Sequence, residues 1–151
     1  MICINHEGAQ LRVAELGGEL RGYRGAAGTE YLWSGDPAVW KGVSPVLFPA
    51  IGALKGGGAT IAGAFYPVPR HGFARELPMR VTEQGEDFVT LTLTETPETK
   101  RLYPFAFALS VTHRLCGDGF ETRFTVENHA GRPMPFLIGG HPAFACPVGG
   151  Q

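Results

Sequence analysis

The chain has 151 residues, of which 44% are hydrophobic and 18% charged; this composition is typical of one globular domain and excludes a disordered chain. Thirteen lysines and arginines against fourteen acidic residues leave a formal net charge of −1 without a basic stripe, so neither nucleic acid nor a membrane surface is expected as a partner. The 22 glycines, 12 prolines and 10 phenylalanines favour short strands joined by turns over a helical bundle.

Hydropathy and cysteine usage predict a cytoplasmic protein. No apolar stretch approaches the roughly 20 residues that cross a bilayer, and the N-terminal residues lack the basic and apolar regions of a signal peptide. Cys3, Cys116 and Cys146 are odd in number and lack metal-type spacing, so the sequence predicts neither a disulfide framework nor a zinc site. We interpret the three cysteines as small buried hydrophobes.

Short strands are expected through the first half of the chain. They cover residues 11–16, 19–23, 30–33, 60–62 and 65–68, with glycine-containing turns between them. Asp36 followed by Pro37 predicts a single capped helical turn that runs through Trp40, because proline suits the first helical position.

The second half carries the strongest strand patterns. Residues 88–94 alternate between apolar and threonine positions, and residues 105–115 place their odd positions on one apolar face. A further alternating run begins at Phe120, and the Asp118-Gly119 pair before it predicts a tight hairpin. With no long amphipathic helix, repeat or linker, residues 1–151 are expected to form a single all-β domain, an antiparallel β-sandwich.

Several common catalytic patterns are absent from the sequence. Lys55 precedes three glycines and is followed by a predicted strand, which indicates a hairpin loop and not a phosphate-binding loop. Ser44 and Ser110 lack a nucleophile elbow. No histidine pair has the helical spacing of a zinc protease site, so no metal site is expected.

Two of the five histidines lie in restricted loops just after predicted strands, where functional side chains concentrate. His71 is surrounded by prolines and a glycine, and His141 lies between two glycines and a proline. Either can transfer protons near neutral pH or, alternatively, simply bond its own backbone. Arg70 and Arg75 add donors for hydroxyl, carboxylate or phosphate groups. His113, by contrast, lies on an apolar strand face and is interpreted as a core residue.

The order of several motifs resembles the aldose 1-epimerase (galactose mutarotase) family, especially its bacterial branch near the hexose-6-phosphate mutarotases. The motifs are Glu-Tyr-Leu-Trp at 30–33, Asp-Pro-Ala-Val-Trp at 36–40, Ser-Pro-Val-Leu-Phe-Pro at 44–49, Ile-Gly at 51–52, His-Gly-Phe-Ala-Arg at 71–75, Leu-Tyr-Pro-Phe at 102–105 and Gly-Gly-His-Pro-Ala-Phe at 139–144. The resemblance implies a large antiparallel β-sandwich with a sugar cleft, no metal and no organic cofactor.

The same resemblance implies an activity and site residues. Family members interconvert the α and β anomers of an aldose: a glutamate base and a histidine acid open the sugar ring, which closes on the other face. By motif, His141 is similar to the general acid, and His71 and Arg75 are similar to substrate-binding residues. The implied partner is a small sugar or sugar phosphate. Ala53 stands where the family often has another substrate-binding arginine.

Length is the other departure from the family pattern. Family members are about twice as long, and their glutamate base belongs to the half that would follow Gln151. We therefore expect residues 1–151 to be the N-terminal portion of a larger, here incomplete, sandwich, whose open sheet edges favour self-association. The alternative is a non-catalytic carbohydrate-binding or sensing module, in which Trp33, Trp40 or Phe144 would stack on a sugar.

Overall fold

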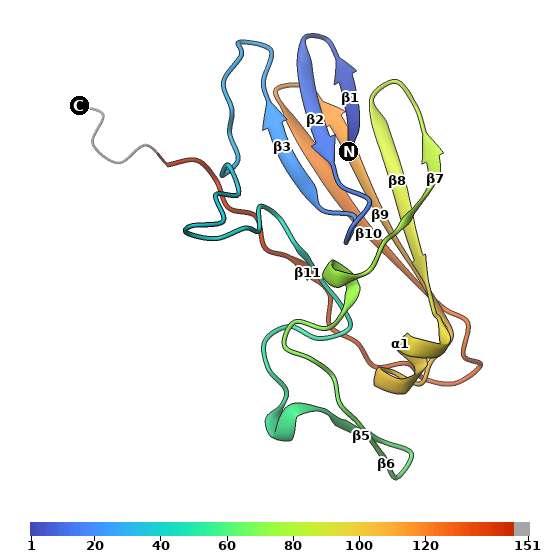
Figure 1. Ribbon diagram of the computed structural model, residues 1–151. Coiled ribbons are helices and arrows are strands. Elements are labelled where there is room, and N and C mark those ends of the chain that lie inside the picture. Colours follow the sequence, from blue (N-terminus) through green and yellow to red (C-terminus); the bar gives the residue numbers. More distant parts are fainter. Residues whose placement is uncertain (147–151) are drawn as a thin grey trace.

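The computed structural model describes residues 1–146, and these form two antiparallel sheets and two short accessory strand pairs (Figure 1). The strands are β1 (Ile2–His6), β2 (Ala9–Val13), β3 (Leu20–Arg24), β4 (Val46–Leu47), β5 (Ala59–Ile61), β6 (Ala64–Tyr66), β7 (Arg80–Gln84), β8 (Phe88–Thr94), β9 (Phe107–Cys116), β10 (Gly119–Asn128) and β11 (Gly139–Gly140). A single α-helix, α1 (Pro97–Leu102), occurs in the described part. The predicted antiparallel all-β fold is confirmed.

The hydrophobic core lies between a three-stranded sheet, ordered β1-β2-β3, and a four-stranded sheet, ordered β10-β9-β8-β7. Leu11 and Val13 of β2 and Leu109 and Val111 of β9 have no exposed surface. The alternation that places these residues on one face of each strand is the period of two that a half-buried strand requires. The described residues thus form a sandwich of two layers.

The predicted hairpin is confirmed as the β9–β10 pair. Its register places Gly119 opposite Cys116, which leaves a two-residue loop that Gly117 enters at a φ of +50°. All the odd positions from Phe105 to Leu115 are buried, as expected. The strand predicted at 88–94 corresponds to β8.

Other predicted elements need correction. Residues 30–33 form only isolated bridges, from Glu30 to Arg24 and from Leu32 to Phe144, because this segment runs between loops and does not lie along a sheet. The strands predicted at 11–16, 19–23, 60–62 and 65–68 appear with shifted ends as β2, β3, β5 and β6. The segment from Lys55 to Gly57 is a 3₁₀ turn that leads into the β5–β6 hairpin.

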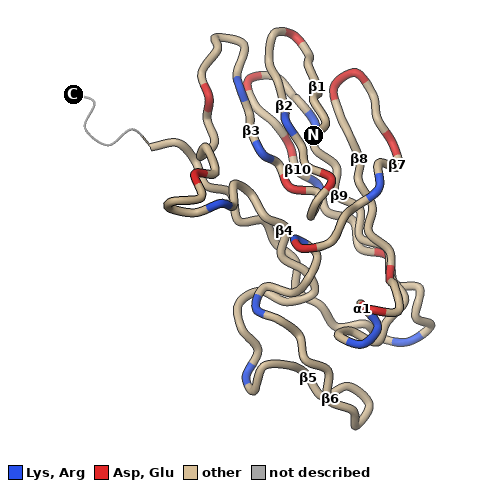
Figure 2. Tube along the Cα trace, viewed as in Figure 1, with Lys and Arg blue, Asp and Glu red and all other residues tan. Residues whose placement is uncertain are grey.

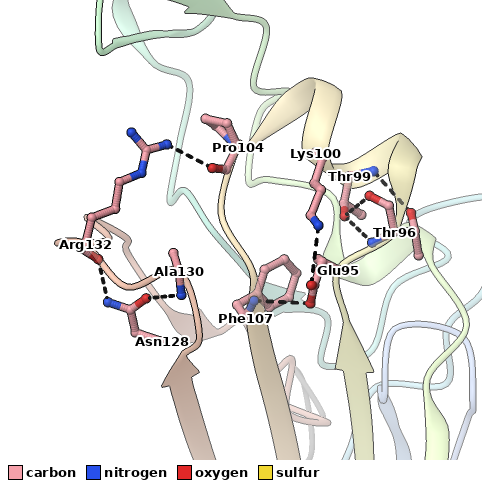
Figure 3. Close-up of polar contacts among 9 residues, drawn as sticks. All are labelled: Glu95, Thr96, Thr99, Lys100, Pro104, Phe107, Asn128, Ala130 and Arg132. Carbon is pink, nitrogen blue, oxygen red and sulfur yellow. Dashed lines mark hydrogen bonds and ion pairs between the residues drawn. The ribbon is translucent and has the colours of Figure 1, made fainter.

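The helix α1 connects the two long strands β8 and β9 (Figure 3). Thr96 caps it by accepting a hydrogen bond from the Thr99 N–H at 3.2 Å, while the Thr99 hydroxyl accepts one from the Thr96 N–H at 2.8 Å. This is a capping box with threonine in place of the usual Glu or Gln. Glu95 accepts a hydrogen bond from the Phe107 N–H and pairs with Lys100, which ties the helix to the start of β9.

Lysine and arginine positions are scattered among aspartate and glutamate positions along the described Cα trace (Figure 2). Within residues 1–146, no helix has the length and hydropathy needed to span a membrane. The three cysteines are exposed and free, so their interpretation as buried hydrophobes is wrong. Cys3 points outward from β1 and Cys116 lies at a hairpin turn, positions that the burial tendency of cysteine does not anticipate.

Candidate functional site

Two loop segments cross beside the sandwich and position His71. The carbonyl oxygen of Phe48 accepts hydrogen bonds from the N–H groups of Phe73 at 2.9 Å and Ala74 at 3.2 Å. Gly72 lies against Phe48 with a φ of +72°, and a Cβ at this position would overlap the Phe48 carbonyl. The glycine of the 71–75 motif is therefore required by the close approach of two backbones.

His71 itself is a half-buried residue in an uncommon backbone conformation. Its φ is +68°, which is unfavourable for a side chain with a Cβ and is typical of functional sites. Its N–H donates to the Gly52 carbonyl at 2.8 Å, and its ring Nδ1 accepts a hydrogen bond from the Gly52 N–H at 3.0 Å. Burial, and next the charges of Arg70, Arg75 and His141, lower the pKa of His71 below 6.5.

His141 follows the short strand β11, which pairs with β4. The pairing continues beyond the strands, because the His141 N–H donates to the Pro45 carbonyl at 3.1 Å and the Ala143 N–H donates to the Val43 carbonyl at 2.8 Å. The backbone at His141 is therefore fixed, while its side chain is exposed. Its ring lies 5.3 Å, between centroids, from the indole of Trp40.

The two histidines predicted to be functional share one pocket. Their ring centroids are 6.5 Å apart, although the two residues are 70 positions apart in the chain. The pocket has a volume of about 300 Å³ and is lined by Trp40, Pro45, Leu47, Arg70, His71, Arg75 and His141. All three site residues proposed from the sequence, His71, Arg75 and His141, thus line the same pocket.

Arg75 lies at the wall of this pocket on a short 3₁₀ turn. Its Nη2 donates to the Arg70 carbonyl at 3.3 Å, and its Nε lies 3.4 Å from a carboxylate oxygen of Glu76. That Nε is buried and makes no properly directed hydrogen bond within the described residues. The guanidinium group is therefore held against its own segment, on Arg70 and Glu76.

Trp40 is a pocket residue that the sequence left ambiguous between core and sugar contact. The predicted turn before it is present: the Asp36 carboxylate accepts from the Ala38 N–H at 2.9 Å, and the Asp36 carbonyl accepts from the Trp40 N–H at 2.8 Å. Trp33 donates from its indole to the Trp40 carbonyl at 2.8 Å and packs on the core. The turn after Asp36 and the hydrogen bond from Trp33 hold Trp40 where its ring lies beside that of His141.

The other candidate groups lie apart from this pocket. His113 is buried in the core, where Gly18 and Thr122 satisfy both ring nitrogens, as the sequence predicts. Ala53 and Lys55 are exposed and do not line the pocket. Within residues 1–146, no three His, Cys, Asp or Glu side chains are placed to hold a metal ion.

Two imidazoles and two guanidinium groups around one pocket can donate hydrogen bonds to a ligand rich in oxygen, and the imidazoles can also transfer protons. Within the described chain, no Asp or Glu side chain lines this pocket. The arrangement therefore supplies donors and an acid, but no carboxylate base.

Comparisons with known proteins agree with this fold. Residues 1–150 match the family described as aldose 1-epimerase. LacX of Lactococcus lactis subsp. lactis is 34% identical over 151 residues, which cover 96% of this chain and 50% of LacX. The chain therefore belongs to the aldose 1-epimerase family.

Two solved structures resemble the chain closely. A galactose mutarotase related enzyme from Lactobacillus acidophilus is 32% identical with a TM-score of 0.93, covering 98% of this chain and 50% of that protein. A galactose mutarotase-like protein from Lactobacillus casei is 36% identical with a TM-score of 0.91, and the match covers 95% of this chain and 49% of that protein. The chain spans about half the length of the relatives that it matches.

Proposed function

We propose that this chain carries the acid side of a mutarotase active site, which interconverts the α and β anomers of a hexose or hexose phosphate. The observation that carries the proposal is the meeting of His71 and His141 in one pocket with Arg75. Membership of the aldose 1-epimerase family supports the same class of reaction.

In the proposed mechanism, His141 is the general acid. A glutamate base takes the proton from the anomeric hydroxyl, His141 gives its proton to the ring oxygen, and the bond between C1 and the ring oxygen breaks. The open-chain aldehyde rotates about C1–C2, and the same two groups act in reverse to close the ring on the other face. His141 suits this role because its backbone is fixed while its ring is exposed to the pocket.

His71 and Arg75 are proposed to bind the sugar. Arg70 and Arg75 line the pocket and carry planar donor groups that suit vicinal hydroxyls or a phosphate. Ala53 supplies no such donor, so we propose that these two arginines bind the anionic or hydroxyl-rich end of the substrate. Glucose, galactose and their 6-phosphates are the substrates to test.

The glutamate base is proposed to lie outside residues 1–151, within a larger protein of which this chain is the N-terminal portion. The absence of an acidic side chain from the pocket lining of the described residues supports this, and so does the half coverage of the relatives. The 151-residue chain alone should then show little or no activity. Polarimetry on fresh α-glucose, α-galactose and their 6-phosphates tests this. Full activity of the isolated chain would refute the proposal that the base lies outside residues 1–151.

The alternative function is that of a non-catalytic sugar-binding or sensing module. Trp40 favours it, because an indole over the pocket is the kind of surface on which the apolar face of a sugar stacks. The two functions separate in one comparison with the reading frame extended to the length of the relatives. Saturable sugar binding without acceleration of anomer exchange identifies the binding module, whereas acceleration identifies the enzyme.

A further inference from the structure

Gly52 holds His71 through two hydrogen bonds of opposite direction. The Gly52 carbonyl accepts the His71 N–H at 2.8 Å, and the Gly52 N–H donates to the ring Nδ1 of His71 at 3.0 Å. Both residues have a positive φ, +75° and +68°. The two conformations turn the Gly52 backbone toward the imidazole, so one residue fixes both the main chain and the ring of His71.

The second of these bonds determines which ring nitrogen carries the proton. A nitrogen that accepts a hydrogen bond has no proton of its own, so the neutral ring of His71 is protonated on Nε2. A proton on Nδ1 would face the Gly52 N–H, donor against donor. The doubly protonated ring meets the same conflict.

The charges around the pocket also favour the neutral ring of His71. Arg70, Arg75 and His141 all line it, and all three disfavour an imidazolium at position 71. The nearest carboxylate on this segment, Glu76, lies beside Arg75. Within the described residues, Nε2 of His71 has no hydrogen-bond partner, so its N–H is available to a ligand in the pocket.

We propose that Gly52 is a positioning residue that holds His71 as a neutral hydrogen-bond donor, with its Nε2–H for a sugar oxygen, and so leaves proton transfer to His141. This inference deepens the function proposed above and rests on it for the identity of the ligand. The ring of His141, in contrast, makes no hydrogen bond to residues 1–146 and is exposed.

The tautomer can be measured without any activity. In ¹⁵N-histidine-labelled protein, His71 is assigned by the loss of its signals in the His71→Gln variant. We expect Nε2 in the protonated shift range, Nδ1 in the unprotonated range, and a titration midpoint below 6.5. A proton on Nδ1, or a midpoint above 6.5, would overturn the inference whatever the protein does with sugars.

Two variants of His71 test the donor. In His71→Asn the amide oxygen can still accept the Gly52 N–H, and Asn tolerates a positive φ, but nothing replaces Nε2. In His71→Gln an amide N–H reaches the Nε2 position. We expect His71→Asn to weaken binding of galactose and glucose 6-phosphate about tenfold, the loss of one hydrogen bond, and His71→Gln to restore at least half of that loss.

These outcomes separate the two proposals. If His71→Asn binds sugar as the native protein does, the donor role is wrong. If the native reading frame, extended to the length of the relatives, binds no sugar while the His71 ring is still protonated on Nε2, the proposed function fails and the tautomer assignment stands. Thermal melts of both variants show whether a loss of binding reflects unfolding.

Discussion

At the residue scale, the guanidinium group of Arg75 is held in place at the wall of the pocket. Its Nη2 donates to the Arg70 carbonyl at 3.3 Å, and its buried Nε lies 3.4 Å from a carboxylate oxygen of Glu76. An arginine held in this way presents a fixed set of planar donors. The site therefore depends on the shape of the guanidinium group as well as on its charge.

Replacing Arg75 with lysine tests this dependence. Arg75→Lys keeps the charge but loses the paired donors. In the reading frame extended to the length of the relatives, we therefore expect the KM for a hexose 6-phosphate to rise about tenfold and that for the free hexose to rise less. The matched control is Arg101→Lys in the last turn of α1, a residue that does not line the pocket. Equal KM values in both variants would show that Arg75 does not bind substrate.

His113 makes a prediction about stability and pH. Burial lowers the pKa of His113, and its two hydrogen bonds suit the neutral ring, with Nε2 donating to the Gly18 carbonyl. The unfolded chain therefore binds a proton more readily than the folded one, so this contribution to stability is complete above pH 6.5 and decreases as the pH falls below it. The pKa of His71 is also lowered, so His71 adds to the loss of stability at acidic pH.

Urea unfolding of the native chain and of His113→Gln, at a series of pH values on either side of 6.5, measures this effect. We expect the free energy of unfolding of the native chain to fall more steeply with acidification than that of the variant. Parallel curves would mean that His113 is not buried in its neutral form.

The sequence predicts the role of His113 better than it predicts the meeting of His71 and His141. The apolar face of its strand identifies His113 as a core residue, because alternation is local information. The 6.5 Å separation of His71 and His141 depends on β4 pairing with β11, a contact that no local pattern encodes. Only the order of the motifs indicates that the two histidines belong to one site. Nothing in the sequence indicates that the His71 ring accepts a hydrogen bond from the Gly52 N–H.

At the element scale, the crossing of residues 46–52 with 69–75 depends on Gly72. Gly72→Ala introduces both an unfavourable positive φ and an overlap with the Phe48 carbonyl. The matched control is Gly63→Ala in the β5–β6 turn, where φ is also positive but a Cβ meets nothing within 4 Å. We expect the control to lose about 1 kcal/mol of unfolding free energy and Gly72→Ala about 3 kcal/mol.

The two losses are compared by chemical denaturation. Similar destabilisation of both variants would mean that the backbones do not approach closely at Gly72. Sugar binding gives a second measure, since Gly72→Ala displaces His71 and the control does not touch the pocket.

Long and short elements differ in how well the sequence predicts them. β8, β9 and β10 alternate over seven to ten residues and were predicted with nearly correct ends. The two-residue strands β4 and β11 carry no periodic signal, and β11 consists of glycine alone. α1 was missed because its cap, Thr96 before Pro97, lies in a segment too short for a helical period.

At the scale of the whole molecule, β10 is an open edge. It pairs with β9 on one side only within the described residues, and an apolar hollow of about 350 Å³ lies beside it. Phe120 and Phe124 of β10 line this hollow, together with the largely exposed Phe144. An unpaired edge next to an apolar surface favours pairing with another strand.

The 151-residue chain is therefore expected to self-associate. Analytical ultracentrifugation should show a mass that rises with concentration, and adding a charge to the hollow with Phe124→Lys should reduce this rise. The matched control is Phe65→Lys, at an exposed position in the β5–β6 hairpin. A monodisperse monomer that melts cooperatively would contradict the expectation of an incomplete sandwich.

The central claim is that His141 is the acid of an anomer-exchanging site, and NMR exchange spectroscopy on the reading frame extended to the length of its relatives tests it most directly. We predict that the native protein accelerates exchange between the α and β anomers of at least one of glucose, galactose or their 6-phosphates. His141→Asn should bind the same sugar and slow that exchange by about a hundredfold or more. Equal exchange rates for the two proteins, or no acceleration of any of these sugars, would contradict the claim.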